Sequence, residues 1–391
     1  MEAHLLGPSR IPLIVGVSLF ALLVIPAFAA DQAEWQNCRA NTSTNPDQSI
    51  ASCTRIIGDT AETPANRAKA YFNRGLAYSS KKDYDRAIAD YSEAIKLDPT
   101  YSRAYANRGF GYYNKKDYDR AIADFSEAIR LDPKYAWAYA NRGSIRTAKG
   151  EFDLAIADLT EAINLDPKYV WAWFLRGFAQ HEKIRITHKG GWDLAIADYS
   201  EVIKLDPKYI LAYANRGIVY SSKGDYDRAL PDCSEAIKLD PNFASGYNCR
   251  GGAYFGKKDY DRAIADFSEA IRLNPKQQVY YLGRGNCYYG KGDYDRSIVD
   301  YTEAIKVNPK YFEAFNKRGK AYAAKRDYSR AIADYTEAIR LDPNYVDAYN
   351  NRGIAFKALR RRAEAIADFR KALSIDPADQ TSQKELRSLG G

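Results

Sequence analysis

A motif of 34 residues that recurs along most of the chain is the feature that most restricts its possible folds. One clear copy spans Ala104–Pro133, and the distance to the next copy is 34 residues everywhere except between Val170 and Ile210, where it is 40. A fixed period of this length is typical of stacked-repeat architectures, in which each unit packs only against its neighbours. The nine copies begin near Ala68, Ser102, Ala136, Val170, Ile210, Ala244, Gln278, Phe312 and Val346.

Each copy is predicted to be a helical hairpin. Each copy contains two sets of small and aromatic residues. Within each set the residues are spaced by four and then three positions, which places them on one face of a helix. In the second copy the sets are Tyr105, Gly109 and Tyr112, and Ala121, Phe125 and Ala128. A polar turn, residues 114–117, separates the sets, and Pro133 cannot continue the second helix. No single hairpin can bury its apolar face alone, so the copies must stack.

This pattern resembles the tetratricopeptide repeat. Position eight is Gly and position thirty-two is Pro in all nine copies, and position twenty is Ala in every copy except that with Ser297. The resemblance implies an all-α, right-handed superhelical solenoid of stacked helix-turn-helix repeats over residues 68–377. It also implies a concave groove lined mainly by the first helix of each repeat, through positions two, five, six, nine, twelve and thirteen. It implies nothing about catalysis.

The first 29 residues have the layout of a secretory signal peptide. Arg10 precedes the apolar run Ile11–Ile25, and Pro26 and a small-residue segment follow it. We expect cleavage after Ala29 and a periplasmic or secreted protein. The alternative is an uncleaved N-terminal membrane anchor, because Ile11–Ala30 is long enough to span a bilayer.

Residues 30–67 form a degenerate N-terminal repeat. Cys38 and Cys53 fall near positions nine and twenty-four, on the facing sides of two antiparallel helices. In an exported protein this arrangement predicts a disulfide that staples the weak terminal hairpin. Two buried free thiols are the alternative.

Three further cysteines, Cys233, Cys249 and Cys287, replace ordinary repeat positions, and their odd number leaves at least one unpaired. Residues 378–391 are polar and helix-capable. We expect them to form a C-terminal capping helix, because a solenoid must cover its last exposed interface.

The recurrent charged residues are interpreted as scaffold. Position seven is Arg and position twenty-three is Asp in all nine copies, which predicts a ladder of ion pairs between helices. Asn at position six is expected to point into the groove, where its amide could hold the backbone of an extended peptide. These residues are Asn73, Asn107, Asn141, Asn215 and Asn351, and the alternative is that their side chains are only solvated.

Departures from the motif concentrate in copies three and four. Large aromatic residues at groove positions predict a recognition surface, and the candidates are Phe110, Trp137, Trp171, Phe174 and Phe178. The six extra residues come next, within the segment 181–191. The alternative is that the Trp rings pack on adjacent helices and the insertion is only a longer turn.

Composition and motifs argue against nucleic-acid binding and catalysis. The chain has 58 Lys and Arg against 50 Asp and Glu, a net charge of +8, and the two signs are interspersed rather than gathered into a basic stripe. Phosphate loops and nucleophile motifs are absent, and the spacing of His181 and His188 fits no standard metal site. We therefore expect a non-enzymatic scaffold without cofactor or metal that binds a protein or an extended peptide. A self-associating structural component of an envelope complex is the alternative.

Overall fold

The computed structural model describes residues 30–40, 42–187 and 191–390. These described residues form twenty-one α-helices and contain no strand, which confirms the predicted all-α repeat fold. The predicted signal peptide, residues 1–29, lies outside the described residues, as does His188 in the insertion.

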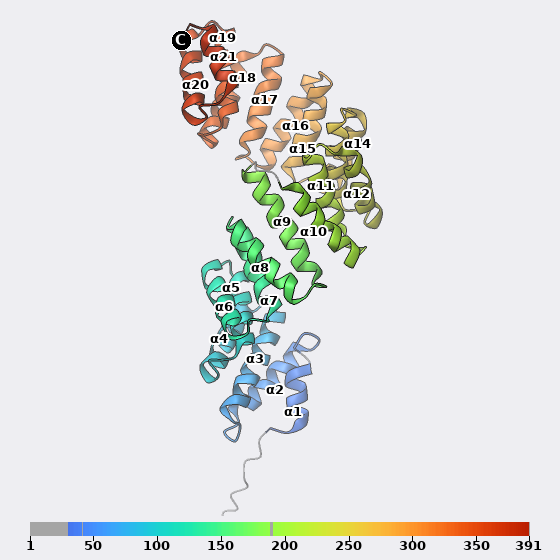
Figure 1. Ribbon diagram of the computed structural model, residues 1–391, viewed down its shortest axis with the longest axis vertical. Helices are drawn as coiled ribbons and strands as arrows, with labels where there is room; N and C mark the ends of the chain where they lie inside the picture. Colours follow the sequence, from blue (N-terminus) through green and yellow to red (C-terminus); the bar gives the residue numbers. More distant parts are fainter. Residues whose placement is uncertain (1–29, 41, 188–190, 391) are drawn as a thin grey trace, which may run out of the picture. The chain divides into compact units, whose positions relative to one another are not determined.

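The chain divides into two compact units, one reaching Leu131 and the other starting at Asp132. Figure 1 labels the helices of both units. The helices of the first unit are α1 Gln32–Ala40, α2 Pro46–Gly58, α3 Pro64–Ser80, α4 Tyr84–Leu97, α5 Ser102–Asn114 and α6 Tyr118–Leu131. Those of the second unit are α7 Ala136–Ala148, α8 Phe152–Leu165, α9 Val170–Thr187, α10 Trp192–Leu205, α11 Ile210–Ser222, α12 Tyr226–Leu239, α13 Ala244–Gly256, α14 Tyr260–Leu273, α15 Gln278–Gly290, α16 Tyr294–Val307, α17 Phe312–Ala324, α18 Tyr328–Leu341, α19 Val346–Ala358, α20 Arg362–Ile375 and α21 Gln380–Ser388.

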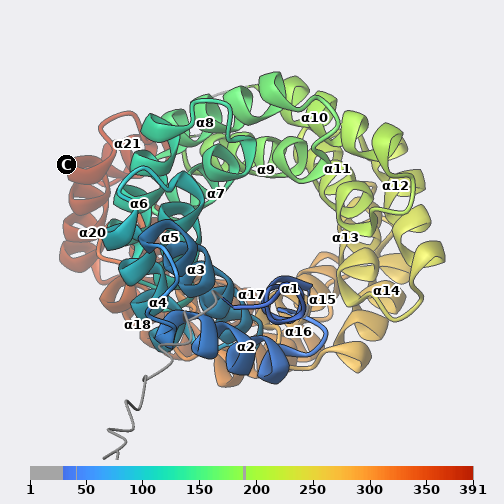
Figure 2. The same cartoon turned by 90° about the horizontal axis from the view of Figure 1, so that it is seen from below.

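Each repeat is a pair of helices that packs on the next pair within the same unit. Within the second unit, α9, α11, α13 and α15 lie on the inner side and α10, α12 and α14 on the outer side (Figure 2). The invariant glycine allows the two helices of a pair to approach closely. At Gly143, for example, an added Cβ would lie 2.7 Å from the Leu159 side chain.

The Arg–Asp ladder is present in all nine repeats. Each arginine donates two hydrogen bonds of 2.7–2.9 Å to the two carboxylate oxygens of one aspartate, whose residue is at most 7% exposed. Paired, two-point contacts of this kind are stronger than single exposed ion pairs. The ladder therefore ties the two helices of every repeat together, as predicted.

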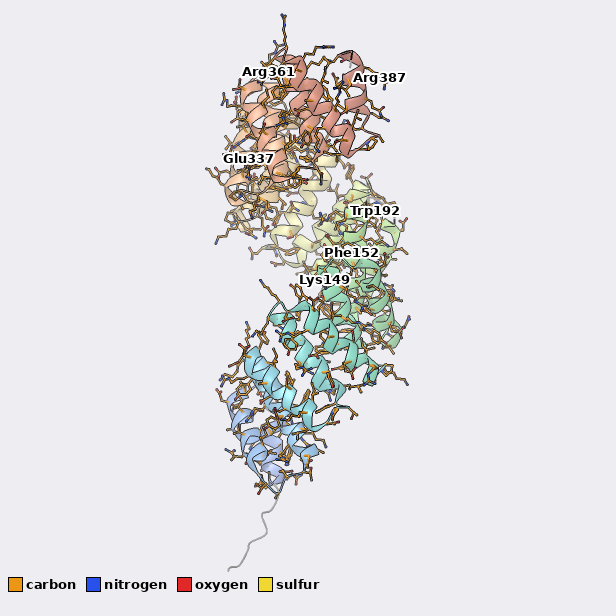
Figure 3. The ribbon with its side chains drawn as sticks, turned by 90° about the vertical axis from the view of Figure 1, so that its left-hand side faces the viewer. Lys149, Phe152, Trp192, Glu337, Arg361 and Arg387 are labelled. Atoms are coloured by element: carbon orange, nitrogen blue, oxygen red, sulfur yellow. A yellow bond between two sulfur atoms is a disulfide. The ribbon has the colours of Figure 1, made fainter. Side chains whose placement is uncertain are left out.

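The insertion in repeat four mostly lengthens a helix. α9 has 18 residues, whereas α7 and α11 have 13 each. Repeats three and four also begin their second helices differently: Phe152 opens α8 and Trp192 opens α10, where tyrosine is usual (Figure 3).

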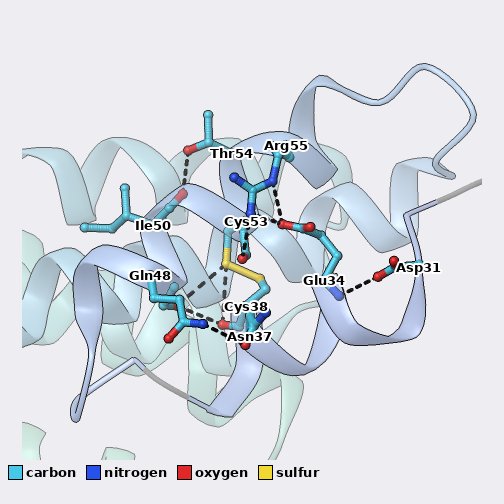
Figure 4. Close-up of polar contacts among 11 residues, drawn as sticks. Asp31, Glu34, Asn37, Cys38, Gln48, Ile50, Cys53, Thr54 and Arg55 are labelled. Carbon is cyan, nitrogen blue, oxygen red and sulfur yellow. Dashed lines mark hydrogen bonds and ion pairs between the residues drawn. A yellow bond between two sulfur atoms is a disulfide. The ribbon is translucent and has the colours of Figure 1, made fainter.

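A disulfide joins the helices of the first hairpin. The sulfur atoms of Cys38 and Cys53 lie 2.05 Å apart, and both residues are fully buried between α1 and α2 (Figure 4). The Ser49 hydroxyl donates to the Cys38 carbonyl oxygen at 2.8 Å beside this bond. At the other end of the chain, Leu386 of α21 is 8% exposed and packs against the core of α20.

A second disulfide joins Cys233 on α12 to Cys249 on α13. Cys287 is the one free cysteine among the described residues, and burial raises the pKa of its thiol to about 12. The prediction that one of these three cysteines stays unpaired is thus confirmed in the structure.

Candidate functional site

Two hollows lie on the inner side of repeats five to eight, along α11, α13, α15 and α17. A first hollow of about 440 Å³ is lined by residues that include Ile218, Asn248, Phe255, Val279, Leu282 and Asn286. A second hollow of about 300 Å³ adjoins it and is lined by Phe255, Tyr260, Asn286, Tyr289, Gly290, Tyr301, Lys317 and Lys320. The two share Phe255 and Asn286, and together they are called the inner cleft here.

Missing side chains create the inner cleft. Gly252 has no atom within 4 Å of where its Cβ would stand, so the helix surface there is open. At Gly256 and Gly283, rings from the second helices occupy the space instead. An added Cβ would lie 2.2 Å from the Tyr226 ring at Gly256 and 2.5 Å from the Phe267 ring at Gly283. Rings from the outer layer therefore form the floor of the cleft, where other repeats present side chains of the inner helix.

The walls of the inner cleft are largely apolar. Phe255 and Val279 line the first hollow and are 38% and 39% exposed. The Phe255 and Tyr260 ring centroids are 5.9 Å apart. Exposed rings and branched chains in a concave surface suit the burial of apolar side chains from a ligand.

Amide and ammonium groups supply the polar side of the inner cleft. The Tyr301 hydroxyl donates to Asn286 Oδ1 at 2.9 Å, which leaves the Asn286 amino group as the donor available to the hollow. Lys320 Nζ stands 5.9 Å from the centre of the Tyr289 ring. Burial lowers the pKa of the Lys317 ammonium, and the positive charge of the neighbouring Lys320 lowers it further.

Most of the predicted asparagines use their amides within the fold. The amide of Asn73 donates to Cys38 Sγ at 3.8 Å. Asn107 and Asn141 each donate at 2.8 Å to the backbone carbonyl four residues earlier, and Asn141 is 6% exposed. Asn215 is half-buried on α11, next to the inner cleft rather than among the residues that line it.

The predicted aromatic residues lie half-buried on three helices of two units. Phe110 is on α5 in the first unit and its ring centroid is 6.3 Å from that of Tyr113. Trp137 and Trp171, on α7 and α9, approach Tyr135 and Tyr169 at 5.8 and 6.2 Å.

Two more of these aromatic residues lie on α9. Phe174 packs between Tyr199 and Tyr209 at centroid distances of 5.8 and 5.2 Å, as a core residue would. Phe178 is half-buried on the same helix.

The outer side of repeats three and four has its own apolar surface. In most other repeats an arginine at position nineteen stacks on the tyrosine at position eleven, as Arg86 does on Tyr78 at 4.4 Å. In repeats three and four the arginine is replaced by Leu154 and Leu194, which are 51% and 63% exposed. A hollow of about 310 Å³ lies beside Leu194.

Within the described residues, no group of three or more His, Cys, Asp or Glu side chains could hold a metal ion. His181 is 7% exposed, and its ring centroid is 6.0 Å from that of Trp192. Glu182, the nearest acidic residue in the sequence, pairs with Arg185 at 2.8 Å. No helix in the described part of the chain combines the length and apolar character needed to cross a membrane.

The sequence interpretation missed the inner cleft, although a signal was present. Glycine appears at groove positions nine and thirteen of repeat six and at positions six and thirteen of repeat seven, as Gly252, Gly256, Gly283 and Gly290. Lysine appears at groove positions six and nine of repeat eight, as Lys317 and Lys320. The tryptophans of repeats three and four are a stronger departure from the repeat pattern than these substitutions are.

Two family models match most of the chain. The model described as tetratricopeptide repeat matches residues 68–101, 102–135, 210–243, 244–277 and 346–379. The model described as TPR repeat matches residues 143–183, 187–224, 285–325 and 319–359.

Solved structures similar to this one are also repeat proteins. A tetratricopeptide repeat protein from Parabacteroides merdae matches with a TM-score of 0.56 and 19% identity, over 65% of this chain and 98% of its own. A chain in the structure of the APC/C hetero-tetramer Cut9–Hcn1 matches with a TM-score of 0.54 and 14% identity, over 88% of this chain and 83% of its own. Yeast Tom70 matches with a TM-score of 0.50 and 17% identity, over 88% and 84% of the two chains. At these identities the likeness concerns the fold.

Proposed function

Because this chain belongs to the tetratricopeptide-repeat family, we propose that it is a non-catalytic scaffold that binds an extended segment of a partner protein in its inner cleft. Members of the family are typically scaffolds for protein–protein interaction. The observation that carries the proposal is the cleft itself, which is concave, exposes Phe255 and Val279, and carries the amides of Asn248 and Asn286 along its length. Apolar side chains of a ligand would fill the hollow, while the amides would bond its backbone.

We also propose that the protein acts after export, in the periplasm or outside the cell. Two features support this: the signal-peptide pattern of residues 1–29 and the disulfide between Cys38 and Cys53, a bond that persists in oxidising compartments. An N-terminal membrane anchor would place the same repeats in the same compartment.

A binding experiment with a cleft-filling variant tests the groove proposal. The mature protein is presented to an array of acetylated and amidated nonapeptides that vary the placement of Leu, Phe, acidic and polar residues. Gly252→Phe places a ring in the open space of the cleft, and we expect it to remove most binding while the thermal midpoint changes little. Gly58→Phe is the matched control, because Gly58 also has open space around its Cβ but lies on α2 in the other unit.

Two outcomes would contradict the groove proposal. One is that no peptide binds the wild type. The other is that Gly252→Phe binds peptides as well as the wild type does, whereas Trp171→Ala loses them at unchanged stability. That second result would move the site to the aromatic residues of repeat four.

Self-association is a second candidate function, and the exposed Leu154 and Leu194 favour it. Large apolar side chains on adjacent outer helices are typical of an interface between protein molecules. Sedimentation of the wild type over a range of concentrations tests this. Oligomers that dissociate when both leucines are changed to Arg would support it, and a monomer at every concentration would refute it.

A further inference from the structure

The structure assigns the Lys317 end of the inner cleft to one ligand group, an aspartate or glutamate side chain of the bound peptide. This inference rests on the proposed function and specifies the chemistry of the ligand.

The polar groups of the second hollow are mainly hydrogen-bond donors. Asn286 Oδ1 already accepts from Tyr301, so the amide presents its amino group. Lys317 and Lys320 add two ammonium groups, and no Asp or Glu is among the residues that line this hollow. A group with several acceptors and no donor complements such a set, and an ionised carboxylate is that group.

The two lysines are unusual because they are half-buried and yet form no ion pair, whereas the other unpaired lysines of the described residues are exposed. Lysines at position fourteen pair with an aspartate of the preceding repeat, as Lys223 and Lys257 do with Asp193 and Asp227 at 2.6 and 2.5 Å. Within the described part of the chain, neither Lys317 nor Lys320 forms an ion pair or a hydrogen bond. Partial burial of an ammonium group that has no ion-pair partner is unfavourable, and a bound anion would offset that cost.

The surroundings of Lys317 favour a singly charged ligand group. The positive charge of Lys320 disfavours the charged form of Lys317. The carboxylates of Asp347 and Glu313, which lie beyond ion-pair distance, favour it. These two carboxylates would oppose a dianionic phosphate more strongly than a carboxylate. No arginine lines the hollow, although arginine is the usual partner for two-point recognition of phosphate.

The ligand carboxylate is assigned to a side chain, because the inner surface continues past the lysines. Ile354 on α19 occupies the same repeat position as Lys320 and is 43% exposed. A peptide that runs from Val279 past Lys317 therefore meets another apolar contact beyond the acidic residue. A chain terminus at Lys317 would leave that contact unused.

Matched peptides test the assignment. From the array, the best-bound sequence with an acidic residue is made in four forms: Glu, Gln or phosphoserine at that position with amidated ends, and Gln there with a free C-terminal carboxylate. Affinities are measured by fluorescence anisotropy. We expect the wild type to bind the Glu form about tenfold more tightly than the Gln form, as for one charge-assisted contact, with the preference falling as salt rises.

Lys317→Met and Lys320→Met should each remove the preference for Glu over Gln and leave the affinity for the Gln form unchanged. Lys291→Met is the control, because Lys291 lies on the adjacent repeat but pairs with Asp261 outside the cleft. Its Glu-to-Gln ratio should equal that of the wild type. A purely structural role for Lys317 would change both affinities together and leave the ratio intact.

The remaining outcomes are decisive as well. A wild type that binds peptides without distinguishing Glu from Gln refutes the assignment and leaves the groove proposal standing. Preference for the phosphoserine form or for the free terminus over the Glu form also refutes it, in favour of that other anion. If no peptide binds at all, the groove proposal itself fails.

Discussion

Asp300→Asn should destabilise repeat seven far more than the loss of an exposed ion pair in the same repeat. The Asp300 side chain is 3% exposed and accepts two hydrogen bonds from Arg284 at 2.8 and 2.9 Å. The Arg296–Asp293 pair lies on the surface, with the two side chains 64% and 29% exposed. The two pairs therefore differ in burial while sharing one hairpin.

Removing one partner of a buried pair leaves an uncompensated charge, which typically costs about 3–5 kcal/mol. Because the Arg284 side chain is 23% exposed, water can solvate part of the remaining charge, and we expect about 3 kcal/mol for Asp300→Asn. Arg296→Gln should cost less than about 1 kcal/mol. Replacing both buried partners, with Arg284→Met and Asp300→Leu, should recover much of the loss, because no charge is then left unpaired.

Urea unfolding followed by circular dichroism measures these differences. The wild type, the single variants Arg284→Met and Asp300→Leu, and the double variant form a mutant cycle, for which we expect a coupling energy of roughly 2 kcal/mol or more. The interpretation of the ladder would be wrong if Asp300→Asn cost no more than Arg296→Gln. It would also be wrong if the double variant were as unstable as the sum of its single changes.

Three further predictions follow from particular residues. Pro231 is exposed and is the sixth residue of α12, past the first turn, so Pro231→Ala should restore a backbone hydrogen bond and raise the thermal midpoint, by up to about 3 kcal/mol in stability. Replacing Cys38 and Cys53 by Ala should lower the stability of the first unit by about 3 kcal/mol, and intact mass with thiol alkylation should show a bonded chain that begins near Ala30. Burial lowers the pKa of His181, so as pH falls protons bind the unfolded chain, whose histidine has a pKa near 6.5, before they bind the folded one. The wild type should therefore lose thermal stability relative to His181→Leu between about pH 7 and about pH 5, and an unchanged difference between the two proteins would refute this.

The scaffold could be predicted from the sequence because its features recur. The arginine and aspartate of each ladder pair keep their helix positions in every copy, so one physical interpretation applied nine times. The Cys38–Cys53 pairing could be inferred in the same way, since the repeat pattern extends weakly into residues 30–67. Periodicity therefore determined which faces meet.

The inner cleft could not be predicted in this way, because it forms where glycines replace larger side chains of the inner helices. A glycine such as Gly252 opens a hollow only if no neighbouring ring fills it, whereas the Phe267 ring does fill the space at Gly283. The sequence of one repeat does not reveal which occurs. Whether an asparagine amide is available to a ligand depends equally on its neighbours. The Asn141 amide donates to the Trp137 carbonyl oxygen, whereas Asn286 accepts a hydrogen bond from Tyr301 through its oxygen.

The most direct test of the groove proposal is to locate a bound peptide by photo-crosslinking. Benzoylphenylalanine is introduced in place of Val279, which is 39% exposed on the wall of the inner cleft, and separately in place of Trp171 on α9. Each protein is irradiated with the peptide that the array selects, and the adducts are counted by mass spectrometry. We predict adducts from position 279 that disappear with excess unlabelled peptide, and none from position 171. Adducts from position 171 alone would contradict the account and place the ligand on repeat four.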